Sequence, residues 1–236
     1  EERGSKMKNR TAGIVGALFI AATVTAIVAM GFLGSTLDAP DYLINVAENE
    51  TQVIIAVILE SILAVSVIGI GILMFPILRK HLESLALGYA AIRLTEAIFI
   101  VVSSISLLSL LTVSQEYVAG AGEPANYQAL GTLLLALRDW ALVFGTLIFL
   151  GLGGLPLYYV LYRSSLVPRW LSGWGLIGAT LILFTGVLGL FGLSPESSTT
   201  TLLAAPIALQ EMVFAVWLIV KGFAPSAFAS GTATGV

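Results

Sequence analysis

Residues 83–112, ESLALGYAAIRLTEAIFIVVSSISLLSLLT, are a membrane-length apolar run that contains the charged residues Arg93 and Glu96. A helix of about 20 apolar residues, rising about 1.5 Å per residue, crosses a hydrocarbon core of roughly 30 Å. Backbone groups in lipid must be hydrogen-bonded within the protein, so only helices and closed barrels span membranes. The in-and-out alternation of a barrel strand is absent from this stretch. We therefore predict a transmembrane helix.

The same pattern recurs along the chain of 236 residues, which is 58% hydrophobic and only 11% charged. A soluble domain carries about a quarter charged residues. The fold class predicted is all-α, a polytopic transmembrane helical bundle within residues 7–223. Residues 1–6, which precede Met7, are interpreted as a remnant of the expression vector that does not belong to the fold, and residues 224–236 as a flexible tail. A short interfacial helix is expected near Pro40. The six predicted spans are residues 11–34, 51–78, 83–112, 127–161, 167–193 and 201–220.

The basic residues predict an orientation for this bundle. Of the eleven Lys and Arg residues, nine flank the spans on one side: Arg3, Lys6, Lys8, Arg10, Arg79, Lys80, Arg163, Arg169 and Lys221. The loops on the opposite side contain acidic residues and no basic one. Because positive charge favours the cytoplasmic side, we predict a multi-pass protein of the inner (plasma) membrane with both termini in the cytoplasm.

Composition also excludes several classes of protein. The chain has no cysteine, which excludes disulfides, thiolate metal sites and iron–sulfur clusters. Its single histidine, His81, excludes a bis-histidine haem and a His-rich metal cluster, so no cofactor and no metal are predicted. Basic residues do not cluster on a solvent domain, and we expect no nucleic-acid partner. The expected partner is the lipid bilayer, and a second copy of the chain remains open.

Six ionisable residues and one glutamine lie well inside the predicted spans. A charge at the centre of a membrane helix costs about 2.5–3.5 kcal/mol, so these side chains must meet one another or water. All six charges lie about nine to thirteen residues from a span end, which predicts one shared polar layer that serves as a binding site. The residues of this predicted layer are Glu60, Arg93, Glu96, Arg138, Asp139, Gln210 and Glu211.

Helical spacing suggests neighbours for these residues. Arg93 and Glu96 are three apart and share a stripe with Tyr89 and Ser103. Trp140, beside the adjacent charges of the fourth span, is expected to form a wall of the site.

The charge balance of the predicted layer also has a consequence. Two arginines face four carboxyl groups, so we expect one carboxyl to hold a proton, or a cation to compensate. Glu60 and Glu211 have no basic neighbour on their own helix and are the two candidates for the proton-carrying group.

Several stretches together resemble a known family. They are LALGYAAIRLTE (residues 85–96), LLSLLTVSQEY (107–117), LGTLLLALRDWA (130–141), LYRSSLVPRWLSGWGLIGA (161–179) and PIALQEMVFAVWLIVKGF (206–223). They resemble small bacterial membrane proteins catalogued as domain of unknown function 4386. The resemblance implies a bacterial or archaeal integral membrane protein, but no activity and no catalytic residue.

Three functions remain open at this point. A transporter for a small solute, cation or proton would use the charged layer directly, in a water-filled cavity that opens to the acidic face. A membrane-embedded enzyme acting on a lipid would use carboxyl pairs as acid and base, but the spans lack histidine and cysteine. A sensor or assembly protein would need the ion pairs only as a structural clamp. We favour binding or transport over an enzyme and predict no catalytic residue.

Overall fold

The computed structural model describes residues 2–37, 40–194 and 197–224, without the side chains of residues 2–9 and 35. The described residues contain helices and no strand, which confirms the predicted all-α class. The elements are α1 (Glu2–Leu37), α2 (Tyr42–Glu48), α3 (Glu50–Leu78), α4 (Glu83–Val118), α5 (Pro124–Leu142), the π-helix η1 (Val143–Phe149), α6 (Leu150–Ser164), α7 (Arg169–Leu190) and α8 (Ser198–Val220).

Among the described residues, six helical segments are long and apolar enough to cross a membrane, as the sequence predicts. Most of their bounds agree with the predicted ones to within three residues, and two segments differ in other respects. Helix α4 continues for six residues beyond 112, because its polar end keeps helical hydrogen bonds until Gly120, which has a φ of 68°. The fourth segment, Pro124–Ser164, is divided by η1, which apolar periodicity does not reveal. A short helix, α2, is present where the interfacial helix was expected, whereas residues 225–236 of the predicted tail lie outside the described residues.

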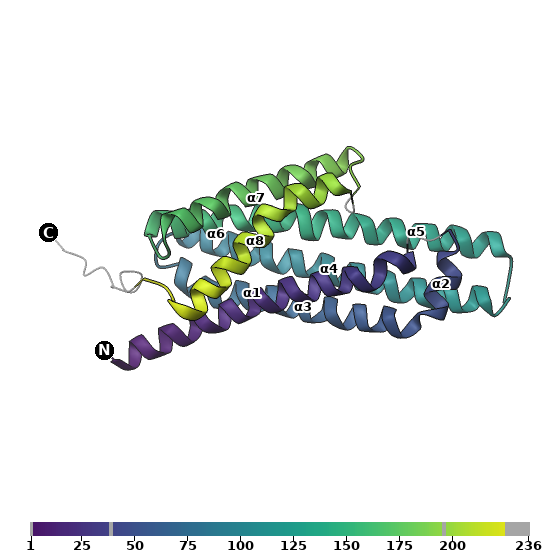
Figure 1. The fold of residues 1–236 in the computed structure, drawn as a ribbon, viewed down its shortest axis with the longest axis horizontal. Helices are drawn as coiled ribbons and strands as arrows, with labels where there is room; N and C mark the ends of the chain where they lie inside the picture. The colour runs from purple at the N-terminus through teal and green to yellow at the C-terminus, as the bar shows by residue number, and fades with distance from the viewer. Residues whose placement is uncertain (1, 38–39, 195–196, 225–236) are drawn as a thin grey trace.

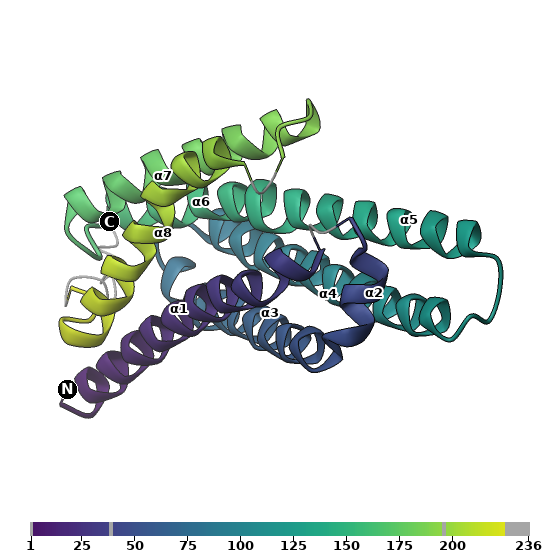
Figure 2. The ribbon, with the colours of Figure 1, turned by 45° about the vertical axis from the view of Figure 1, so that its right-hand side comes forward.

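The helices form an elongated bundle (Figures 1 and 2). The start of α1 and the end of α8 lie at one end of the bundle, and α2 and the turn between α4 and α5 lie at the other. Helix α4 packs against α2, α3, α5, η1 and α6. It is therefore the central helix, and side chains on its buried faces can meet partners from most of the bundle.

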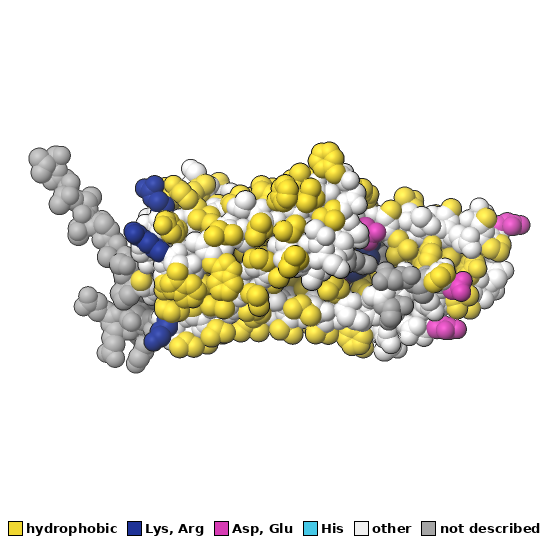
Figure 3. Space-filling model, turned by 45° about the horizontal axis from the view of Figure 1, so that its top comes forward, with side chains coloured by type: hydrophobic (Ala, Val, Ile, Leu, Met, Phe, Trp, Pro, Cys, Tyr) yellow, Lys and Arg dark blue, Asp and Glu magenta, His cyan; other side chains and the backbone are white. Residues whose placement is uncertain are grey.

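The two ends of the bundle differ in charge (Figure 3). Arg79, Lys80, Arg163, Arg169 and Lys221 belong to the turns at the end where α8 finishes. Asp41, Glu48, Glu50, Glu116 and Glu123 belong to the opposite end, where the described loop residues include no Lys or Arg. The charge separation inferred from the sequence thus exists in three dimensions. The assignment of the basic end to the cytoplasm stays a prediction.

Glycines allow close helix packing around the charged interior. A Cβ at Gly16 of α1 would lie 2.5 Å from the carbonyl oxygen of Ala215 on α8. A Cβ at Gly151 of α6 would lie 2.8 Å from the backbone nitrogen of Leu183 on α7. Small residues at such crossings let helix backbones approach within a membrane. The contact at Gly16 holds α8 close to α1, and α8 carries Glu211.

Candidate functional site

The buried charges form two clusters rather than one layer. Tyr89, Arg93, Glu96 and Ser103 follow one buried stripe of α4, but Ser103 comes seven residues after Glu96. Seven residues correspond to about 10 Å along the helix axis. The buried, apolar side chain of Ile100 lies on this stripe between them. Depth along each span predicts a shared layer, but the tilt and offset of the packed helices divide the charges between two depths.

The outer cluster joins α3, α4 and α5 near the acidic half of the bundle. It consists of Glu60, Ser103, Ser104 and Arg138, all buried. Arg138 Nη2 lies 2.6 Å from Glu60 Oε1, and Arg138 Nη1 lies 3.4 Å from Glu60 Oε2. Arg138 Nη1 also donates to Ser103 Oγ at 2.8 Å, while Ser104 Oγ donates to Glu60 Oε2 at 2.6 Å. One arginine faces one carboxylate here, and the pair is well hydrogen-bonded.

The inner cluster joins α4 and α8 and consists of Tyr89, Arg93, Glu96 and Glu211. Arg93 Nη1 donates to both oxygens of Glu96, at 3.1 and 3.0 Å, and Arg93 Nε donates to the Tyr89 hydroxyl at 3.1 Å. Arg93 Nη2 lies 3.8 Å from Glu211 Oε1, within ion-pair distance but beyond hydrogen-bond length. One guanidinium therefore faces two carboxyl groups, which it pairs unequally.

Residues of other helices enclose Arg93. Its Cζ lies 5.8 Å from the centre of the Phe19 ring on α1, a distance suited to a cation–π contact. A Cβ at Gly71 of α3 would lie 3.0 Å from Arg93 Cβ, and a Cβ at Gly153 of α6 would lie 4.0 Å from Arg93 Nε. The glycines thus leave room for a guanidinium that is only 2% exposed.

Three buried polar atoms around the inner cluster have no hydrogen-bond partner among the described residues. They are Arg93 Nη2, the Tyr158 hydroxyl and Gln210 Oε1. Gln210 precedes Glu211 on α8 and uses its amide nitrogen to donate to Leu171 O at 3.2 Å. The Tyr158 ring of α6 contacts Phe214, one helical turn beyond Gln210, at 6.0 Å between ring centres. The Tyr158 and Gln210 side chains lie near each other. Arg93 Nη2 faces Glu211 at 3.8 Å. These atoms therefore have polar neighbours but no short hydrogen bond, and each can accept or donate a further one.

The structure corrects two expectations about the fourth span. The side chain of Asp139 is exposed, and that of Trp140 is 48% exposed, so neither is buried with the two clusters. Successive helical residues differ by about 100° in direction, and Arg138 occupies the buried direction. Ser103 is buried as expected, but it binds Arg138 rather than the Arg93 group.

The sequence reasoning missed two polar contributors. Ser104 follows Ser103, and only the packing of α3 shows that it reaches Glu60. Tyr158 is 1% exposed, whereas the nearby Tyr159 and Tyr162 are 40% and 41% exposed. All three look like members of an interfacial aromatic belt, and nothing in the local pattern distinguishes the buried one.

One cavity of the structure lies apart from the buried charges. A cavity of about 250 Å³ lies at the acidic end of the bundle, between α2 and the ends of α4 and α5. No residue of the inner or outer cluster lines it. The charged clusters and this outer pocket are therefore separate features.

The fold and the clusters define a class: a six-span helical membrane bundle with buried ion pairs at two depths. Within this class, the chain belongs to the family described as domain of unknown function (DUF4386), which it matches over residues 14–222. The resemblance inferred from the sequence is thereby confirmed, and the matched range includes both clusters. No curated protein and no solved structure matches the chain.

Proposed function

We propose that this protein binds a proton at Glu211 in the inner cluster and moves it across the membrane. The observation that carries the proposal is the pairing of one buried guanidinium with two carboxyl groups, at 3.0 Å for Glu96 and 3.8 Å for Glu211. With both carboxyl groups ionised, the cluster would hold one uncompensated negative charge in a low-dielectric interior. Ionisable groups buried in membrane spans commonly serve ion or proton pathways.

Glu211 is the better of the two candidates for the proton. Glu96 accepts two hydrogen bonds from Arg93, which favour its charged form, whereas Glu211 has only the longer contact. The side chain of Glu211 is 12% exposed and that of Glu96 is 5% exposed, so Glu211 is the more accessible. Glu60, the other candidate, is matched by its own arginine at 2.6 Å. The proton therefore belongs to the inner cluster.

The unpartnered polar atoms supply neighbours for a transferred proton. Arg93 Nη2 can donate a hydrogen bond, Gln210 Oε1 can accept one, and the Tyr158 hydroxyl can do both. A water molecule that meets two to four such groups is stable in a protein interior. Water between these groups and Glu211 would give the proton a hydrogen-bonded route.

The π-helix η1 supports movement near this site. A Cβ at Gly145 of η1 would lie 2.9 Å from Phe99 Cβ and 3.5 Å from the backbone oxygen of Glu96. The π-helix therefore packs on the turn of α4 that carries Glu96. Single π-helical turns within α-helices often occur at functional sites, where the altered hydrogen bonding eases a local shift.

The outer cluster has a different role under this proposal. Its charges are balanced one to one and its hydrogen bonds are short, so it needs neither a proton nor a ligand. It clamps α3, α4 and α5 together. Under this proposal the inner cluster is a functional site, and the outer cluster is a structural ion pair.

Proton flux into liposomes tests the proposal. The full chain is reconstituted with a pH-sensitive dye inside the vesicles, and a potassium diffusion potential drives proton entry. We expect acidification above that of empty liposomes, and a loss of at least tenfold in Glu211→Gln. Glu48→Gln, which removes an acidic charge from the end of α2, is the matched control and should keep the parent rate.

An infrared spectrum gives a second readout. At neutral pH the parent should show a protonated carboxyl band that disappears in Glu211→Gln and persists in Glu48→Gln. Parent liposomes that acidify no faster than empty ones would refute proton movement. A parent without the band would refute proton binding.

A further inference from the structure

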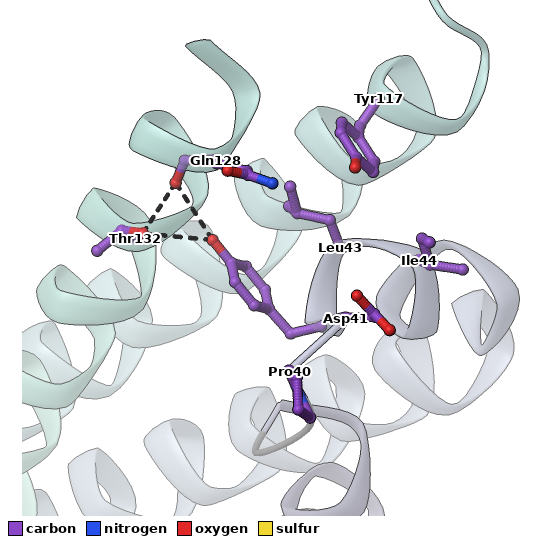
Figure 4. Close-up of a pocket in the computed structure, with 8 residues that line it drawn as sticks. Pro40, Asp41, Leu43, Ile44, Tyr117, Gln128 and Thr132 are labelled. Carbon is purple, nitrogen blue, oxygen red and sulfur yellow. Dashed lines mark hydrogen bonds between the residues drawn. The ribbon is translucent and has the colours of Figure 1, made fainter. Parts of the chain in front are cut away.

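The cavity at the acidic end of the bundle, which we call the outer pocket, is a second candidate binding site, and it is separate from the proposed proton site. It has a volume of about 250 Å³ and lies where α2 meets the ends of α4 and α5 (Figure 4). Its lining residues are Pro40, Asp41, Tyr42, Leu43, Ile44, Tyr117, Gln128 and Thr132.

Specific contacts hold α2 in place to form this pocket. The Tyr42 hydroxyl reaches α5, where it lies 3.3 Å from the backbone oxygen of Gln128 and 3.4 Å from Thr132 Oγ1. Figure 4 shows these contacts on the α5 side of the pocket. A Cβ at Gly131 would lie 2.6 Å from the Tyr42 hydroxyl and 2.9 Å from Leu43 Cδ2. The missing side chain of Gly131 thus lets α2 dock, and the pocket is a built feature of the fold.

The side chains of the pocket favour a cation. Asp41 contributes an exposed carboxylate, Tyr42 and Tyr117 contribute aromatic rings, and Gln128 contributes an amide. The described loops at this end add acidic residues and no Lys or Arg, so the surrounding field is negative. An anionic ligand is therefore disfavoured.

The same side chains favour an organic cation over a metal ion. No group of three or more His, Asp or Glu side chains that could hold a metal occurs in the part of the chain that the structure describes. A pocket lined by one carboxylate and two tyrosine rings instead suits an ammonium group, which can pair with a carboxylate and lie against a ring. The volume of about 250 Å³ is below the roughly 300 Å³ at which pockets for drug-sized ligands begin, and suits a small ion.

We propose that the outer pocket binds a small organic ammonium ion, with Asp41 as the counter-charge and Tyr117 as the aromatic wall. This pocket does not include Glu211, so evidence for or against ammonium binding leaves the proposed proton site unaffected.

Binding of tetramethylammonium to the full chain in detergent tests this proposal. Saturation-transfer NMR on the methyl signal of the probe reports the affinity, with sodium chloride added to keep the ionic strength constant. We expect saturable binding in the parent and a loss of at least tenfold in affinity in Asp41→Asn. The matched control is Glu48→Gln on the same short helix, which does not line the pocket and should change the affinity less than twofold.

A second variant separates the ring from the charge. A cation–π contact at an exposed site contributes about 0.5–1 kcal/mol, so Tyr117→Leu should weaken binding about two- to fivefold. An unchanged gel-filtration profile for each variant shows that the fold is kept. Absence of saturable binding would overturn the proposal, as would an equal loss in Asp41→Asn and Glu48→Gln, which indicates only a diffuse acidic surface. Glu211→Gln should leave tetramethylammonium binding unchanged, so the two proposals are tested separately.

Discussion

Removing either partner of the Glu60–Arg138 pair should destabilise the protein, but not equally. The two side chains are each 7% exposed and approach to 2.6 Å. Removing one member of a buried ion pair costs about 3–5 kcal/mol, because the other charge is left without compensation. A carboxylate can escape this cost by binding a proton, whereas an arginine cannot lose its charge. The consequences of the two single substitutions therefore differ.

Glu60→Gln leaves the guanidinium of Arg138 charged, and Ser103 remains its hydrogen-bond partner. We expect this variant to lose about 3–5 kcal/mol in the free energy of unfolding. Arg138→Gln lets Glu60 bind a proton while Ser104 still donates to it, so the loss should be about 1–3 kcal/mol, the cost of imperfectly satisfied polar groups. The double variant Glu60→Leu with Arg138→Met should lose less free energy of unfolding than Glu60→Gln, because neither buried charge of the pair remains.

Titration with sodium dodecyl sulfate in dodecylmaltoside micelles, followed by circular dichroism, measures these free energies. Equal losses in both single variants would refute the reasoning.

Two further substitutions test the packing around the clusters. Ser104→Ala removes a hydrogen bond to the buried carboxylate of Glu60 and should lower the free energy of unfolding by about 1.5–3 kcal/mol in the same titration. A loss below about 0.5 kcal/mol, the effect of an ordinary surface substitution, would contradict this role. Gly16→Val would place its Cβ 2.5 Å from a carbonyl oxygen of α8 and should lower the free energy of unfolding by about 1–3 kcal/mol. Gly13→Val is the control, because a Cβ there has nothing within 4 Å. Equal losses in the two variants would refute the close contact between α1 and α8.

Hydropathy was sufficient to predict the membrane segments, because every backbone group in lipid must be bonded within its own helix. The predicted span 51–78 agrees with α3 to within one residue. Hydropathy did not predict that α4 continues beyond residue 112, because the residues at the end of this helix are more polar. The π-helix η1 was not predicted, because apolar periodicity does not report a local change in backbone hydrogen bonding.

The sequence also identified most of the buried charges, because a charge within a membrane-length apolar segment needs a partner. It identified the Arg93–Glu96 pair from spacing alone, since residues three apart are neighbours on a helix. Pairs between side chains of different helices could not be predicted from the sequence. The exposure of Asp139 depends on the rotation of α5 about its axis, which no local pattern fixes.

Hydropathy therefore predicted the membrane-spanning helices and the residues that carry charge within them. Three features appear only in the packed bundle: Glu60 pairs with Arg138, Glu211 shares Arg93 with Glu96, and two clusters form at separate depths. The difference arises because hydropathy and periodicity describe one helix at a time. The partner of a buried charge is chosen by the crossing, offset and rotation of several helices, which arise from packing along the whole bundle.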